Sequence, residues 1–140
     1  MEDFAADPSH PRYDSLLKRH LLESAAQKGM LAESALIAHG RGEAYDYLIG
    51  EKTIETAMTA TKHALYRLKI ANNPVISVNG NTTALAGEEL MKLASLLDCP
   101  IEVNIFYRTP ERMSVLLNHL EEVKQKFGLN VEILGASPDA

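Results

Sequence analysis

The chain has 140 residues, of which 46% are hydrophobic and 24% are charged, and its formal net charge is −5. This composition is typical of one folded domain and excludes a disordered chain. The acidic balance argues against a nucleic-acid partner, because proteins that bind along a phosphate backbone do so with many basic residues. Small phosphorylated ligands stay compatible with it, since one pocket needs only a few cations.

Two features bear on the compartment. Cys99 is the single cysteine, so it cannot form an intramolecular disulfide and suits a reducing environment. The first eight residues are acidic rather than basic and then apolar, and no apolar run approaches the length that spans a membrane. We therefore expect a cytoplasmic protein with no signal peptide and no membrane partner.

Residues 1–72 are expected to form a helical part. Leu17, Leu21 and Ala25 recur at helical spacing, and Gly29 follows as a left-handed cap. A short helix is expected from Leu31 to Ala38, ended by the turn at residues 39–42. A long helix should begin after Thr53 as its N-cap, with one apolar face. That face comprises Ile54, Met58, Thr61, Leu65 and Leu68.

Residues 73–140 are expected to form a Rossmann-like part. The pattern predicts strands at residues 75–78, 101–106 and 131–134, the first of them covered on both faces, separated by two helices. Thr109 and Pro110 are typical of the start of the second helix, and Gly128 of its end. The predicted fold class is α/β within one domain: an N-terminal helical segment, then a half-Rossmann-like β-α-β-α-β parallel sheet.

Two turns carry residues suited to anions. In His39-Gly40-Arg41-Gly42 the glycines allow close approach of a ligand, and Arg41 offers a planar fork of donors. Asn79, Gly80, Asn81 and Thr82 follow the first predicted strand, where ligands of open parallel sheets bind. We expect these two turns to face one shared cavity. Equally compatible are a helix-to-helix turn for the first and an Asn-Gly turn, with Thr82 or Thr83 as a helix cap, for the second.

Arg108 follows the second predicted strand, on the same rim as the Asn-Gly-Asn turn. Its charge opposes the dipole of the next helix unless an anion also binds there, although a solvent-exposed arginine is the common outcome of such a position.

Four segments together resemble one family. HPRYDSLLKR, LIAHGRGEAYDYLIGEKT, PVISVNGNTTALAGEEL and IEVNIFYRTPER resemble the archaeal phosphopantothenate synthetases in order and in spacing. The resemblance implies a homodimeric ligase that condenses 4-phosphopantoate with β-alanine to 4'-phosphopantothenate in coenzyme A biosynthesis. It also implies that ATP is split to AMP and pyrophosphate. Members of the family continue beyond the LGASPDA segment into a further α/β portion, so the chain corresponds to an N-terminal part and is truncated relative to them.

The resemblance also assigns residues. Arg19 and Arg41 match arginines that contact ATP, and Mg²⁺ would be held largely by phosphates rather than by a metal site in the chain. The substrate phosphate would suit Asn79, Gly80, Asn81, Thr82 and Arg108. His39 is the candidate base for the β-alanine amine, because its ordinary pKa lies near neutrality, but it could equally cap a turn or bind phosphate. Lys52 is a candidate for stabilising charge during catalysis.

Two other functions fit the same residues. A non-catalytic module could bind a phosphorylated metabolite with the Rossmann-like part and dimerise through the helical part. A structural interaction domain could use the glycine-rich turns only for their geometry.

Overall fold

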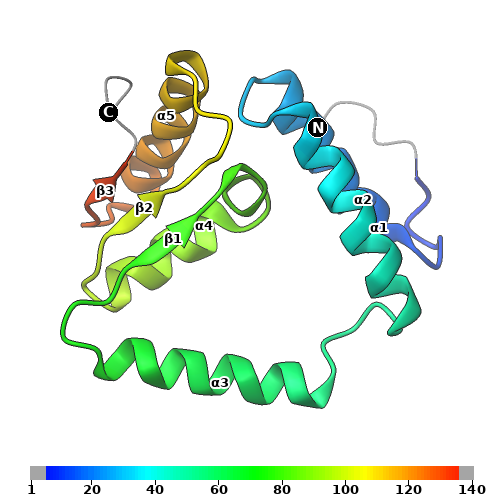
Figure 1. The fold of residues 1–140 in the computed structure, drawn as a ribbon, viewed down its shortest axis with the longest axis horizontal. Coiled ribbons are helices and arrows are strands. Elements are labelled where there is room, and N and C mark those ends of the chain that lie inside the picture. Colours follow the sequence, from blue (N-terminus) through cyan, green and yellow to red (C-terminus); the bar gives the residue numbers. More distant parts are fainter. Residues whose placement is uncertain (1–5, 136–140) are drawn as a thin grey trace.

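The computed structural model describes residues 6–135, which form five helices and a three-stranded parallel sheet. Helices come first: α1 (Tyr13–Gln27), α2 (Glu33–Leu48) and α3 (Glu55–Ile70). Strands and helices then alternate as β1 (Ile76–Val78), α4 (Gly80–Leu96), β2 (Ile101–Val103), α5 (Pro110–Phe127) and β3 (Ile133–Leu134). The predicted α/β class and the half-Rossmann-like order are therefore confirmed (Figure 1).

The sheet has strand order β1-β2-β3, and both pairs are parallel. Val78 lies opposite Val103, so β1 and β2 end at the same edge of the sheet. The backbone N–H of Asn104 donates to the carbonyl of Val78 at 2.8 Å, just beyond the paired residues. The segments that follow the two strands consequently leave the sheet side by side.

Burial alternates along the strands. The second residue of β1, Ser77, is exposed while its two neighbours are buried, and in β2 Glu102 is half-buried between two buried residues. The buried side chains face α4, which packs against both strands. The expectation that the first strand is covered on both faces is wrong for the described residues, because both helices that follow strands pack against each other on one side.

The core lies between the sheet and α4, α5 and α1. Its largest fully buried side chains come from α1, α4, β2 and α5: Leu22, Met91, Ile101, Met113, Leu116 and Leu120. Leu22 rather than the predicted Leu21 points inward, and Leu21 is exposed. Ala25 of the predicted stripe is buried, so the buried face of α1 runs through Leu22 and Ala25 and leaves out Leu21.

The predicted ends of α5 and α1 are confirmed. The Thr109 side chain accepts a hydrogen bond from the backbone N–H of Arg112, with Pro110 in the first turn. Gly128 follows α5 with φ +61°, and Gly29 follows α1 with φ +83°, both in the left-handed region that glycine adopts at little cost.

The prediction that α2 ends at Ala38 is wrong. The helix continues through the glycine pair to Leu48. Two helical glycines cost only about 1 kcal/mol each relative to alanine, and α2 is held against α1 and α4. Arg19 of α1, for example, donates to the carbonyl of Leu36 at 2.8 Å. Packing thus outweighs the local propensity to end the helix.

The start of α3 and the length of the strands also differ from expectation. The N-cap position of α3 is Ile54, not Thr53, and no side chain caps it. The second strand ends at Val103, earlier than predicted. The third strand begins at Ile133, later than predicted. Strand length depends on the partner strand, which sequence alternation alone does not specify.

Candidate functional site

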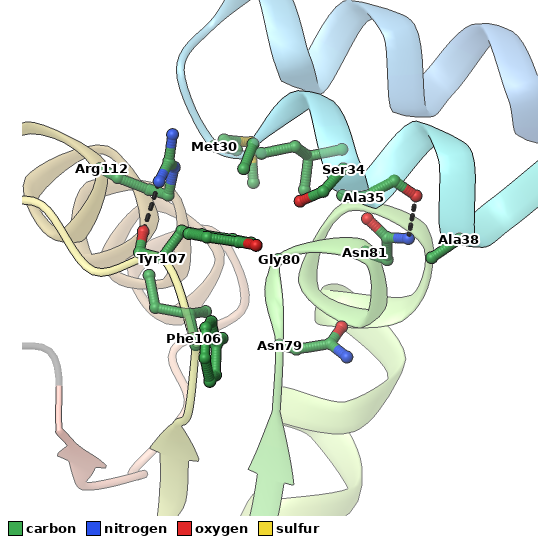
Figure 2. A pocket seen from close by; sticks show the side chains of 13 residues that line it. Met30, Ser34, Ala35, Ala38, Asn79, Gly80, Asn81, Phe106, Tyr107 and Arg112 are labelled. Atoms are coloured by element: carbon green, nitrogen blue, oxygen red, sulfur yellow. Dashed lines mark hydrogen bonds between the residues drawn. The ribbon is translucent and has the colours of Figure 1, made fainter.

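A cavity of about 320 Å³ opens at the carboxyl ends of β1 and β2 (Figure 2). Three segments surround it: the turn into α2, the β1–α4 turn and the β2–α5 segment. Its lining comprises Met30, Leu31, Ala32, Ser34, Ala35, Ala38, Asn79, Gly80, Asn81, Ile105, Phe106, Tyr107 and Arg112. Its volume and position match those of small-ligand sites in open α/β sheets.

The β1–α4 turn is fixed by its own hydrogen bonds. Asn79 Oδ1 caps α4 by accepting from the backbone N–H and the hydroxyl of Thr82, both at 2.9 Å. Thr83, which is buried, donates its hydroxyl to the Asn79 carbonyl at 2.8 Å. The cap is therefore Asn79, and Thr82 supports the turn without lining the cavity.

Gly80 lets this turn approach the segment before α2. A Cβ at Gly80 would lie 2.6 Å from Leu31 Cδ2 and 3.0 Å from the Met30 carbonyl oxygen. The Met30 oxygen belongs to the backbone, which cannot turn aside as the end of a side chain can. The close approach of the two backbones thus requires glycine here and closes one side of the cavity.

Two polar atoms at the cavity have no partner among the described residues. Asn81 donates its amide Nδ2 to the Ala35 carbonyl at 3.1 Å, but its Oδ1 is buried without a hydrogen bond. Arg112 donates from Nη1 to the Tyr107 carbonyl, while its Nε is also buried and unpaired. An unsatisfied buried donor and acceptor are costly, so the pair marks positions that a bound ligand can satisfy.

Arg112 was not predicted from sequence. It lies one turn inside α5, where it reads as an ordinary helix residue, whereas the predicted Arg108 does not line the cavity. The only available signal was that both arginines follow the same strand. Phe106 and Tyr107, which precede Arg108, also line the cavity.

The second predicted turn lies elsewhere. His39 and Gly42 line a separate cavity of about 200 Å³ with Ser15, Lys18, Glu43 and Asp46. His39 Nδ1 is buried there and has no hydrogen-bond partner within residues 6–135. Gly40 lines a third cavity, of about 460 Å³, on another side of α2. The expectation that residues 39–42 and 79–83 face one shared cavity is therefore wrong within a single chain. Residues 39–42 belong to α2, so successive residues face different sides of the helix.

The remaining predicted residues lie outside these three cavities. Arg19 forms an ion pair with Glu23 at 2.8 Å besides its bond to α2. Arg41 is exposed on α2, and Lys52 is exposed in the α2–α3 connection. No cluster of three or more His, Cys, Asp or Glu side chains that could hold a metal ion occurs within residues 6–135.

A cluster of ion pairs joins the residue before α1 to the second half of α2 and to the residues that follow α2. Arg12 contacts Glu51 at 2.8 Å and Glu43 at 3.0 Å, and its guanidinium lies over the Tyr47 ring. Ser15 donates to the same Glu51 oxygen at 2.9 Å. The Arg12 hydrogen bond is the main cause that lowers the pKa of Glu51. These residues fix the start of α1 to the end of α2.

Comparison with known proteins identifies the family. The profile of the phosphopantothenate/pantothenate synthetase family matches residues 56–139, more than half of the chain. A 4-phosphopantoate--beta-alanine ligase of Thermococcus onnurineus is 48% identical over 130 residues, which cover 93% of this chain and 48% of that protein. The ligase of the same name from Methanosarcina mazei is 44% identical over 131 residues, covering 94% of this chain and 50% of that protein.

The chain spans about half the length of these curated relatives. No helix in the described part of the chain is long and apolar enough to cross a membrane. The matched region contains α3 from its second residue, the three described strands and the helices α4 and α5. The chain belongs to the phosphopantothenate/pantothenate synthetase family.

Proposed function

We propose that the chain acts in an ATP-dependent ligase that condenses 4-phosphopantoate with β-alanine in coenzyme A biosynthesis. Family membership and the ligase activity named for the relatives support the reaction class. The observation that carries the proposal is the cavity at the strand ends, with its unpaired Arg112 Nε and Asn81 Oδ1. We further propose a homodimer in the cytoplasm, as the resemblance implies.

The chemistry of 4-phosphopantoate suits this cavity. The molecule has a phosphate and a carboxylate, a hydroxyl group and a carbon with two methyl groups. Arg112 can donate to an anionic oxygen, and the first turn of α4 presents backbone N–H groups of the kind that bind anions. Asn81 Oδ1 can accept from the hydroxyl group. The apolar side chains of Met30, Leu31 and Ile105 can contact the methyl groups.

The reaction requires activation of the carboxylate before an amide can form. In the proposed sequence a carboxylate oxygen attacks the α-phosphorus of ATP and pyrophosphate leaves. The deprotonated β-alanine amine then attacks the acyl carbon of the adenylate, and AMP leaves. Neither step needs a covalent bond to the protein, so positioning and charge stabilisation are its main contributions.

Other residues are assigned to these steps as proposals. Arg19 and Arg41 would contact ATP. Arg19 would use the N–H groups of its guanidinium that do not already donate to Glu23 and Leu36. Mg²⁺ would arrive with the ATP phosphates. His39 would accept the amine proton and Lys52 would stabilise charge only if a second copy brings the cavity of His39 beside the strand-end cavity, because one chain keeps the two cavities apart.

Binding of 4-phosphopantoate tests the cavity directly. We expect Arg112→Lys to weaken binding by tenfold or more in calorimetric titration, about 1.4 kcal/mol, because lysine lacks the planar fork. Arg108→Lys is the matched control from the same segment and should change affinity by less than about twofold. Loss of binding in the Arg108 variant alone would move the substrate site away from this cavity.

Release of AMP tests the reaction. AMP formation that requires both 4-phosphopantoate and β-alanine would support the ligase. Binding of 4-phosphopantoate by the chain without AMP formation would instead favour the phosphometabolite-binding module for these residues.

A further inference from the structure

The side chains that line the cavity at the carboxyl ends of β1 and β2 differ in what they can offer a ligand. Those of the described lining residues that hydrogen bond through nitrogen or oxygen are Ser34, Asn79, Asn81, Tyr107 and Arg112. Arg112 can only donate, and the hydroxyl groups of Ser34 and Tyr107 can rotate to donate or to accept. The two asparagines are less adaptable, because their own hydrogen bonds fix which atom a ligand meets.

Asn79 has only donors left for a ligand. Its Oδ1 already accepts from the backbone N–H and from the hydroxyl of Thr82, both at 2.9 Å. A carbonyl oxygen has two lone pairs, so these two bonds use its capacity as an acceptor. With Arg112 and the backbone N–H groups at the start of α4, the cavity is therefore rich in donors, which suits the phosphate and carboxylate of an acidic ligand.

Asn81 is the exception, because it presents an acceptor. Its Nδ2 donates to the backbone carbonyl of Ala35 at 3.1 Å, and that carbonyl can only accept. A flip of the amide would set two acceptor oxygens against each other at this place. Figure 2 shows the amide nitrogen directed at Ala35 and the amide oxygen turned the other way, toward the side of the cavity from which Tyr107 projects. The orientation of the amide is thus fixed by α2.

The fixed acceptor of Asn81 requires a donor. Asn81 Oδ1 is buried and has no hydrogen-bond partner within residues 6–135. A buried acceptor is costly when it stays unpaired, and it repels the lone pairs of a ligand oxygen that cannot donate. A site built to bond a substrate hydroxyl rejects analogues that lack the hydroxyl, because its own polar group is then left without a partner.

We infer that Asn81 is a specificity-determining residue, which selects an acid with a hydroxyl group on the carbon next to the carboxylate. It rejects the acid of the same size that has an oxo group at that carbon, and the acid that has only hydrogens there. The inference rests on the proposed function, since 4-phosphopantoate has its hydroxyl group at that carbon. It goes further by naming the acids that the site excludes.

The other contacts of the cavity cannot make this distinction. The 2-hydroxy, 2-oxo and 2-deoxy acids carry the same phosphate, carboxylate and methyl groups. Arg112 and the start of α4 therefore meet the same anionic groups in all three acids, and the apolar lining meets the same methyl groups. The ratio of their affinities consequently isolates the contact at the carbon next to the carboxylate.

Calorimetric titration of the 140-residue chain tests the selection in wild type. The ligands are 4-phosphopantoate, its 2-deoxy analogue and its 2-oxo analogue. We expect the 2-deoxy acid to bind about tenfold or more weakly than 4-phosphopantoate, and the 2-oxo acid to bind more weakly still. Equal affinities for the three acids would overturn the inference and leave the proposed function intact. Failure to bind any of them would refute the proposed function, and the inference with it.

Variants then assign the selection to Asn81. Asn81→Leu keeps a similar side-chain volume without the acceptor, so the affinities for the 2-hydroxy and 2-deoxy acids should come within about twofold of each other. Asn81→Ala removes the same amide with a smaller side chain and should give the same result. Partial unfolding of a variant would weaken binding of all three acids by one factor, so it leaves their ratio unchanged.

Two control variants come from the same cavity. Ser34→Ala removes a hydroxyl that adapts to either kind of ligand atom, so it should preserve the preference for the 2-hydroxy acid. Arg112→Lys should weaken binding of all three acids by a similar factor, because each of them has the anionic groups. A preference of tenfold or more that persists in both Asn81 variants would place the selection on another residue and overturn the inference.

Discussion

Gly80→Ala tests whether the close approach at the candidate site shapes the fold. The added methyl would lie 2.6 Å from Leu31 Cδ2 and 3.0 Å from the Met30 carbonyl oxygen, both well inside normal contact. Overpacking of this kind costs about 1–3 kcal/mol. In a domain of this size the loss corresponds to about 2–4 °C in Tm for each kcal/mol.

Gly87→Ala provides the matched control in the same helix. A methyl at Gly87 would meet its nearest atoms, in His119 and Thr83, at 3.6 Å, which is ordinary contact. Removing the backbone freedom of glycine in a helix should stabilise the protein by about 0.5–1 kcal/mol. The two variants should therefore differ by about 1.5–4 kcal/mol in opposite directions.

Urea unfolding followed by circular dichroism measures both variants. A Gly80→Ala protein as stable as wild type would refute the argument, because it would show that Met30 and Leu31 can move away freely. In that case the wall of the 320 Å³ cavity would be adjustable rather than fixed.

Two further predictions concern the core and its pH dependence. Leu116→Ala should lower the free energy of unfolding by about 2–5 kcal/mol, because Leu116 is fully buried. Leu96 is 84% exposed, so Leu96→Ala should change the free energy of unfolding by less than about 0.5 kcal/mol. Equal urea midpoints of the two variants would contradict the assigned core. Burial lowers the pKa of His119, with Glu122 opposing this shift and Lys28 adding to it. The unfolded chain therefore binds the proton more readily, and stability should fall as pH drops below about 6.5. His119→Gln should flatten that decline in unfolding experiments from pH 7.5 to 5; an unchanged slope would mean that other groups cause it.

Much of the local structure was predictable because short-range chemistry decides it. Thr109 and Gly128 mark the ends of α5 through a side-chain acceptor and a left-handed backbone, neither of which depends on distant residues. The alternation of strands and helices after residue 73 likewise follows from hydrophobic periodicity. The position of Asn79, Gly80 and Asn81 at the sheet edge follows from the same order, since parallel strands end together.

Tertiary structure decided the rest. Helix α2 continues through Gly40 and Gly42 because packing on α1 and α4 exceeds the small local cost of two glycines. Arg112 reaches the cavity because buried residues of α5, such as Met113 and Leu116, set the rotation of the helix about its axis, whereas Arg108 precedes the helix. The apolar face of α3 looks like core in the sequence, yet it is exposed in the single chain. Periodicity shows that a face is apolar, but only the arrangement of the other elements determines what covers it.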